Sequence, residues 1–322
     1  MPKRNLPYSA AELASSSEVA KLIAERFHNG KSCSLMRYGD TSGRLIARPD
    51  LGTSEYEYLK SFLGLSVTPE QVDFLAGCVE RSIVSADVIG LRSDLLGQDI
   101  SAHILHAPDD AIRRRLVATY PIREFERTRL GPDDARRLAQ TRKAMEAFVL
   151  PEGALLTDAW VHVSLAEAGF LSALMFDASS FALVTSADRR AVVERIADAL
   201  PNRMRYFECP CYPKAERKWG GDHAFLWQRW MSLADAIVPS YPGEPMIISA
   251  GIWTKVIGPI WASRGGIALD VGSVMDYLDR AATRPAVLAT RKATGQFSYL
   301  TAGQIAPSKS GRHGVQAQLT RR

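Results

Sequence analysis

The stretch Ser34-Leu35-Met36-Arg37-Tyr38-Gly39-Asp40-Thr41-Ser42-Gly43 is a short apolar segment that runs into a polar, glycine-containing turn. Residues 32–37 predict a buried strand that ends at this turn. Arg37 and Asp40 therefore stand at the carboxyl end of a strand. Arginine can hold a diphosphate by two parallel hydrogen bonds, and an aspartate there can hold a divalent cation. A structural Arg–Asp pair that closes the turn is the alternative.

Helix signals precede this strand and follow it. Ser15 and Glu18 have the spacing of a capping box, and Asn29-Gly30 predicts the end of the first helix. Thr68-Pro69 predicts the start of a second helix, since proline suits the first helical position. The predicted strand therefore lies between two helices.

The second half of the chain alternates between short apolar runs and helical patterns. One helix is predicted from Ala187 to Leu200, with Ser186 as its cap. Such alternation predicts a mostly parallel sheet with helices on both faces, a Rossmann-like α/β fold. We expect one α/β domain over residues 1–290 and a basic, partly disordered tail over 291–322. The further runs that predict strands are residues 87–91, 154–157, 181–185, 204–207, 246–249 and 267–270.

The composition is that of an ordinary globular protein, with 46% hydrophobic and 23% charged residues. The net charge of +5 comes from the end of the chain, because residues 281–322 hold seven lysines or arginines and no acid. The remainder is slightly negative. The basic pI is therefore weak evidence for nucleic-acid binding, and we expect no nucleic-acid partner.

Cysteine usage and hydropathy bear on the compartment. Four cysteines are too few and too scattered for a disulfide scaffold. Cys209-Pro210-Cys211 lacks the two-residue spacer of a zinc knuckle, so we expect reduced thiols. No long apolar core follows the N-terminus, and no run approaches the length of a membrane span. We expect a cytoplasmic protein without a transmembrane segment.

Two later strand ends predict turns that bind a ligand. Thr185 and Ser186 precede a helix start, where free amides can receive a phosphate or ribose oxygen. A helix that is merely capped by serine is the commoner reading. At the next such turn, Gly251 allows close approach of a ligand to the backbone, and Lys255 can reach an anionic group. This turn lacks the three spaced glycines of a dinucleotide fingerprint, which disfavours an NAD enzyme.

Acids at other strand ends are further candidates. Asp270 ends the last predicted strand, where it can accept hydrogen bonds from a ribose or cap the following helix. Asp158 and His162 follow another strand and lie one helical turn apart. That spacing allows a metal or acid–base pair, although a core histidine is the more common case.

The segment from residue 209 to residue 223 combines cations with aromatic residues, among them Lys214, Arg217 and Trp219. Such a loop suits a sugar or phosphate acceptor, because aromatic faces stack on sugar rings. A solvated loop with a partly buried tryptophan is the alternative.

Taken together, these positions resemble the GT-D type of glycosyltransferase, a bacterial family in which a Rossmann-like domain transfers sugar from a nucleotide sugar. That family opens with a strand that reads approximately Ser-x-x-Arg-[Phe/Tyr]-Gly-Asp-Gly-Glu. Its later part reads as an apolar strand, a glycine turn, a helix and a second strand ending in Asp-x-Gly. Here residues 247–251, Lys255-Val256 and 269–272 follow that plan. The matches in the opening motif are Ser34, Arg37, Tyr38, Gly39 and Asp40.

The resemblance implies that Arg37 holds the diphosphate and that Asp40 orients the metal or the donor. The chain departs from the motif at Ser42, which stands where the family has glutamate. Loss of a carboxylate should weaken metal binding. Asp158 or Asp87 can complete the site, the enzyme can work without a metal, or the domain can bind without turnover. The positions implied in nucleotide-sugar binding are Ser34, Gly39, Thr185, Ser186, Gly251, Trp253, Lys255 and Asp270.

The leading hypothesis is a cytoplasmic glycosyltransferase of the hexosyltransferase class that uses a nucleotide-sugar donor, expected to be a UDP-sugar. Its expected acceptor is a glycan or a protein, and its expected cofactor is Mn²⁺ or Mg²⁺, with Asp40 and Asp158 as the candidate metal ligands. The second hypothesis is a non-catalytic nucleotide-sugar-binding or partner-binding module of a glycosylation assembly. The third is a SAM-dependent methyltransferase, which the absence of a glycine-rich first turn disfavours. A homo-oligomer is left open.

Overall fold

The computed structural model describes residues 13–46, 67–91, 143, 146–210, 223–272 and 274–275. Within these ranges seven strands form one parallel sheet in the order β3-β2-β1-β7-β6-β4-β5. This confirms the expected Rossmann-like α/β fold, and every strand predicted from an apolar run is present. The strands are β1 (Cys33–Tyr38), β2 (Val88–Leu91), β3 (Leu155–Asp158), β4 (Phe181–Ser186), β5 (Met204–Cys209), β6 (Pro245–Ile248) and β7 (Ile267–Asp270).

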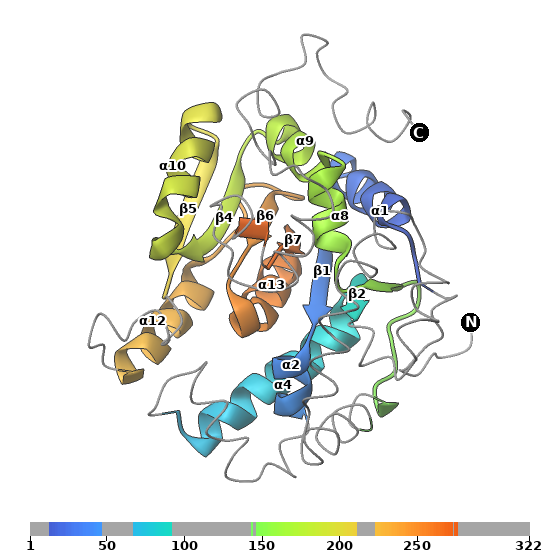
Figure 1. Cartoon of the computed structure of the whole chain (residues 1–322), viewed down its shortest axis with the longest axis vertical. Coiled ribbons are helices and arrows are strands. Elements are labelled where there is room, and N and C mark those ends of the chain that lie inside the picture. The colour runs from blue at the N-terminus through green and yellow to red at the C-terminus, as the bar shows by residue number, and fades with distance from the viewer. Residues whose placement is uncertain are drawn as a thin grey trace, which may run out of the picture.

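Helices cover both faces of the sheet (Figure 1). One face packs against α1, α8, α9 and α10, whose apolar side chains share a core with Leu35, Leu183 and Leu269 of the strands. A strand buried on both faces has little need for polar residues, which explains the nearly continuous apolar runs in the sequence. These helices are α1 (Ser16–His28), α8 (Val161–Glu167), α9 (Phe170–Asp177) and α10 (Arg190–Ala199).

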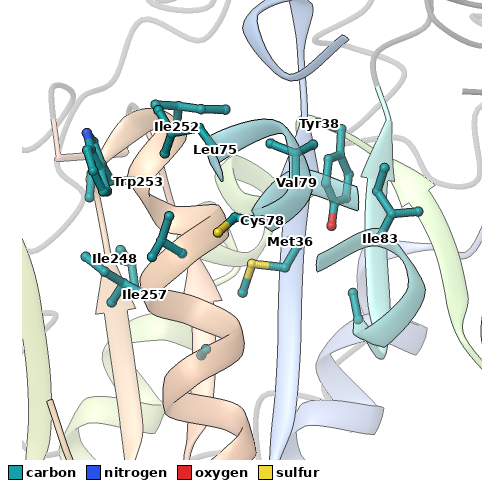
Figure 2. Close-up of a cluster of buried hydrophobic side chains, with 14 of the residues drawn as sticks. Met36, Tyr38, Leu75, Cys78, Val79, Ile83, Ile248, Ile252, Trp253 and Ile257 are labelled. Atoms are coloured by element: carbon teal, nitrogen blue, oxygen red, sulfur yellow. The ribbon is translucent and has the colours of Figure 1, made fainter. Parts of the chain in front are cut away.

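The opposite face holds a second core. Figure 2 shows Met36 and Tyr38 of β1 pointing toward α4, with Ile257 of α13 in the same cluster. Because side chains alternate along a strand, Arg37 projects toward the other face, the one covered by α8. The helices on this second face are α2 (Asp40–Ile46), α4 (Pro69–Ser85), α12 (His223–Ala236) and α13 (Thr254–Ser263).

Two helix starts follow the predicted capping chemistry. Ser15 caps α1 and exchanges hydrogen bonds with Glu18, as a capping box requires. Thr68 caps α4 and exchanges bonds with Gln71 in the same way, with Pro69 at the first helical position. These local signals are reliable because both partners lie within one turn of the chain.

Two local predictions are wrong. The segment after Gly39 is a helix start and not an open turn, because α2 begins at Asp40 and the N–H of Gly43 donates to the Gly39 carbonyl. Ser186 does not cap a helix from residue 187 to residue 200. A short 3₁₀ helix, η3 (Ala187–Arg189), comes first, and the Ser186 hydroxyl donates to Asp188 within it. The N-cap residue of α10 is Arg189, and no side chain caps this helix start.

All strands are parallel, so their carboxyl ends lie along one edge of the sheet. The chain leaves β6 toward the α4 and α13 face, whereas Val274 and Met275, which follow β7, pack into the core of the α8 face. In sheets of this kind ligands bind at the carboxyl ends of the strands, where neighbouring strands send the chain to opposite faces. None of the described helices is long and apolar enough to cross a membrane.

No disulfide joins the cysteines that the structure describes. Cys33, Cys78 and Cys209 are buried and form no disulfide, as expected for reduced cysteines. The fourth cysteine, the predicted tail over 291–322 and the predicted acceptor residues Lys214, Arg217 and Trp219 lie outside the described residues.

Candidate functional site

Arg37, near the carboxyl end of β1, makes most of its hydrogen bonds to two other strand ends. Its Nη1 donates to the Ala159 carbonyl at 3.0 Å and lies 2.9 Å from both ring nitrogens of the buried His162. Its Nε donates to the Asp270 carbonyl at 3.1 Å, and Nη2 lies 3.4 Å from Asp270 Oδ1. A guanidinium has five N–H groups, so one on Nη2 is left without a described partner. Arg37 therefore offers a ligand one hydrogen bond and its charge, instead of the predicted two-bond grip.

Asp270, at the end of β7, is held by cations from both faces of the sheet. Lys255 of α13 donates to its Oδ2 at 2.6 Å, and the backbone N–H of Arg37 donates to the same oxygen at 3.3 Å. The side chains of Lys255 and Asp270 are 3% and 4% exposed, whereas that of Arg37 is 18% exposed. Arg37 is thus the member of this three-residue cluster that solvent reaches.

Burial lowers the pKa of the Lys255 ammonium, and its ion pair with Asp270 acts against that shift. With Lys255 protonated, the cluster of Arg37, Lys255 and Asp270 carries two positive charges and one negative charge. Burial acts to raise the pKa of the Asp270 carboxyl, but the charges of Lys255 and Arg37, together with their hydrogen bonds, lower it below its usual range. Asp270 therefore stays ionised and balances one of its two partners. The cluster as a whole is then left with one net positive charge at the carboxyl edge of the sheet.

Two glycines leave room for the Arg37 side chain. A Cβ on Gly272 would lie 1.8 Å from Arg37 Nη2, and a Cβ on Gly90 would lie 3.2 Å from Arg37 Cγ. Gly272 also has a φ of +42°, a backbone angle that residues other than glycine rarely adopt. Glycine at these two positions is what allows the guanidinium to reach Asp270.

The turn after β6 begins beside Gly272. The Ser249 hydroxyl donates to the Gly272 carbonyl at 2.7 Å, so this turn and Arg37 both contact Gly272. Ala250 has φ −128° and ψ 19°, and Gly251 has φ +55°. The change from a negative to a positive φ resembles the αR–αL pair of an anion-binding nest, in which successive N–H groups turn to one side, but Ala250 itself lies outside the right-handed helical region. In the described part of the chain, the N–H groups of Ala250, Gly251 and Ile252 have no hydrogen-bond partner.

Thr185 lies on β4, the strand next to β6, at the same edge. The hydrogen bonding between β4 and β6 continues one residue past the end of β6, because the N–H of Ser249 donates to the Val184 carbonyl at 2.8 Å. Thr185 is buried, and its hydroxyl has no partner among the described residues. The structure therefore places Arg37, Lys255, Asp270, Gly251 and Thr185 along neighbouring strand ends, as the sequence predicts for ligand-binding residues.

Two predicted residues are placed elsewhere. Ser34 lies near the amino end of β1, and its backbone N–H and Asp87 Oδ2 are 2.9 Å apart. Asp87 also contacts Arg26 at 3.6 Å, so neither Ser34 nor Asp87 is brought to the carboxyl edge. Trp253 is buried, and its ring stacks on that of Trp230, with centroids 4.8 Å apart and planes 8° apart. Its position indicates a role in packing.

The described acids at the carboxyl edge do not make a set of metal ligands. Asp270 is bonded to Lys255 and Arg37, and Asp158 is buried with its Oδ1 accepting from the Trp160 N–H at 2.7 Å. No group of three or more His, Cys, Asp or Glu side chains that could hold a metal is found among the residues that the structure describes. The backbone of Asp40 is described as the start of α2, but its side chain is not. A metal bound by Asp40 stays a prediction.

The contact between His162 and Arg37 has no signal in the sequence. The spacing of Asp158 and His162 suggests a pair of these two side chains, and the structure in addition brings His162 to Arg37, 125 residues away. Likewise, Lys255 and Asp270 are each predicted to meet a ligand, but they meet each other. Positions of this kind follow from the order of the strands, which a single sequence does not give.

Comparisons of the chain with models of protein families, with curated proteins and with solved structures found no match. The resemblance to GT-D glycosyltransferases therefore rests on the motif residues alone. What the structure adds is a Rossmann-like sheet whose carboxyl edge holds the cluster of Arg37, Lys255 and Asp270 and three successive N–H groups with no partner among the described residues.

Proposed function

We propose that this chain binds a nucleotide sugar at the carboxyl edge of the sheet and transfers its sugar to a glycan or protein acceptor. The observation that supports this best is the net positive cluster of Arg37, Lys255 and Asp270 beside the free amides of residues 250–252. A cation and a nest of N–H groups are both suited to phosphate oxygens. The Arg37 guanidinium contacts Asp270 at the end of β7, the strand beside β6, and in this proposal a diphosphate contacts both groups.

The same groups suit the chemistry of sugar transfer. When the bond between sugar and phosphate breaks, negative charge grows on the departing nucleoside diphosphate. Positive groups fixed at that place stabilise this charge without having to reorganise. In this proposal Arg37 and the turn after β6 hold the leaving diphosphate, Asp40 orients the donor, and Thr185 and Ser186 line the nucleotide. The acceptor is assigned to the segment with Lys214, Arg217 and Trp219.

A second candidate function is binding of a nucleotide sugar without transfer. Ser42, at the position where the resembled family has glutamate, is buried on α2 with 4% of its surface exposed. A hydroxyl in the protein interior does not replace a carboxylate that faces a substrate. This observation favours a module that holds the donor for a partner enzyme.

The two candidates are separated by titration followed by a turnover assay. The purified full chain is titrated with UDP-, GDP- and TDP-sugars in the presence of Mn²⁺, and the titration is repeated with Asp40→Ala. We expect saturable binding of one donor, weakened in the variant, because Asp40 begins the helix that follows Arg37. Hydrolysis or transfer of that donor supports the enzyme, and binding without either supports the module. If no donor binds saturably, the proposed function is wrong.

A further inference from the structure

We propose that protein cations, and not a divalent metal, balance the phosphate charge of the nucleotide at this site. The inference rests on the proposed function, and it goes further by naming what the site needs in order to bind. Its basis is the charge and hydrogen bonding of the side chains at the carboxyl ends of β1, β3 and β7.

Asp270 is poorly suited to a metal because donors of the protein face three of the roughly four lone-pair sites of its carboxylate. Oδ2 accepts from Lys255 at 2.6 Å and from the backbone N–H of Arg37 at 3.3 Å, and Oδ1 faces Arg37 Nη2 at 3.4 Å. A metal that bound Oδ2 would have to displace the Lys255 ammonium, which is buried and would lose its partner. Leaving a buried charge without a partner is strongly unfavourable. A second cation would also be repelled by the net charge of the cluster.

The other described positions offer a metal little. Asp158 is fully buried, and its Oδ1 accepts from the Trp160 N–H. The hydroxyl of Ser42 is buried on α2, so the second acid of the resembled motif has no counterpart there. Asp40 is then the one acid of the opening motif that is left. A divalent cation held by a single carboxylate depends on water and on the diphosphate for its other oxygen ligands, so the protein alone would bind it weakly.

The positive charge that a metal would bring is present in the fold. Arg37 is held by the Ala159 carbonyl, His162 and Asp270, and it keeps one N–H on Nη2 for a ligand. Lys255 balances the charge of Asp270, so that of Arg37 is left over. The free amides of residues 250–252 begin one residue after Ser249, whose hydroxyl reaches Gly272 beside Arg37. A phosphate group at this place meets a full positive charge and a nest of donors together.

The test is calorimetric titration of the full chain with UDP and, separately, with inorganic pyrophosphate. Each titration is run in EDTA and in excess Mn²⁺ or Mg²⁺ at the same ionic strength. We expect the dissociation constant of UDP to change by less than about threefold between EDTA and metal. We also expect the affinity in EDTA to fall as salt is added, because the contacts are between ions.

A gain of tenfold or more in UDP affinity on adding metal would overturn this inference and leave the proposed function standing. Absence of UDP and nucleotide-sugar binding both with and without metal would instead contradict the proposed function, and the inference with it. A matched pair of variants adds a second readout. Arg37→Gln should weaken UDP binding in EDTA by tenfold or more, whereas Arg190→Gln, at an arginine whose side chain is 82% exposed on α10, should not. Equal affinities for the two variants in EDTA would also overturn the inference.

Discussion

Lys255 Nζ lies 2.6 Å from Asp270 Oδ2, and both side chains are almost fully buried. The lysine comes from α13 on one face of the sheet, and its ammonium lies 5.2 Å from the centre of the Tyr38 ring. The aspartate ends β7 and also accepts from Arg37, whose side chain projects to the other face. Removing one partner of a buried ion pair leaves the other charge buried and uncompensated. This contact therefore gives the sharpest prediction for stability.

Lys255→Met should destabilise the fold by about 3 kcal/mol, since it leaves the Asp270 carboxylate buried beside a methyl group. The measurement is urea denaturation followed by circular dichroism. Lys21→Met on α1 is the control, because the Lys21 side chain is 73% exposed and should change stability by less than about 0.5 kcal/mol. The double variant Lys255→Met with Asp270→Asn should recover part of the loss. Equal stability of Lys255→Met and the wild type would show that the two groups are not paired in solution.

The lowered pKa of Asp270 predicts a loss of stability in acid. A carboxyl whose pKa is lower in the folded state than its ordinary value of 3.8 contributes stability above that value. The contribution is lost as the pH falls from about 3.8 through the folded pKa. Thermal melts between pH 6 and pH 2 should therefore show a shallower fall in melting temperature for Asp270→Asn than for the wild type. Parallel curves for the two proteins would contradict this prediction.

The place of Arg37 depends on Gly272. In Gly272→Ala the new Cβ would lie 1.8 Å from Arg37 Nη2, so the guanidinium must move away from Asp270. We expect a loss of more than about 1 kcal/mol in stability, by urea denaturation, together with at least tenfold weaker nucleotide binding. Gly265→Ala is the control, because Gly265 also has a positive φ, +95°, but nothing lies within 4 Å of the added Cβ. The control should lose stability through backbone strain alone and keep its affinity for nucleotide.

Arg37→Lys tests whether the shape of the guanidinium matters as well as its charge. Lysine keeps the charge, but it cannot contact the Ala159 carbonyl, His162 and Asp270 with fixed planar geometry. We expect UDP affinity to fall by about tenfold, or about 1.4 kcal/mol, as measured by calorimetry. Arg190→Lys on α10 is the matched exchange at an exposed site. If Arg37→Lys binds UDP as tightly as the wild type, the network around the guanidinium does not position it.

Cys33 should be chemically inert in the folded protein. Burial, with a smaller effect of Asp87, raises the pKa of its thiol from 9.0 to about 12. The folded state therefore holds the proton, and this contribution to stability is complete below pH 9 and declines as the pH rises toward 12. Iodoacetamide at pH 8.5, followed by mass spectrometry of peptides, should leave Cys33 unmodified in native protein and modify it in urea. Rapid native modification would show that β1 opens.

Much of the fold could be predicted from the sequence because its signals are local. A strand buried on both faces leaves an apolar run, and a capped helix leaves Ser15 with Glu18 or Thr68 with Pro69. The helix that begins at Asp40 was missed because Gly39 and Gly43 are typical of turns. In the structure Gly43 lies inside α2, where its N–H bonds to the Gly39 carbonyl.

The site could be predicted only in part. The strand ends of β1, β4, β6 and β7 mark Arg37, Thr185, Gly251 and Asp270 correctly as neighbours at one edge. Which of them touch depends on the strand order, which places β7 between β1 and β6 although it comes last in the chain. The partner of Arg37 is therefore Asp270, 233 residues away, and no spacing rule along the chain could have given that pair.

The position of Asp270 between two helical layers has a mechanical consequence. Its carboxylate ties α13 on one face to the Arg37 side chain on the other, and Arg37 in turn reaches Ala159 and His162 at the start of α8. A shift of either layer along the sheet would pull at the same carboxylate. This edge of the sheet is therefore held in place without a ligand. The positive charge that would face an anion is preorganised, which lowers the cost of binding.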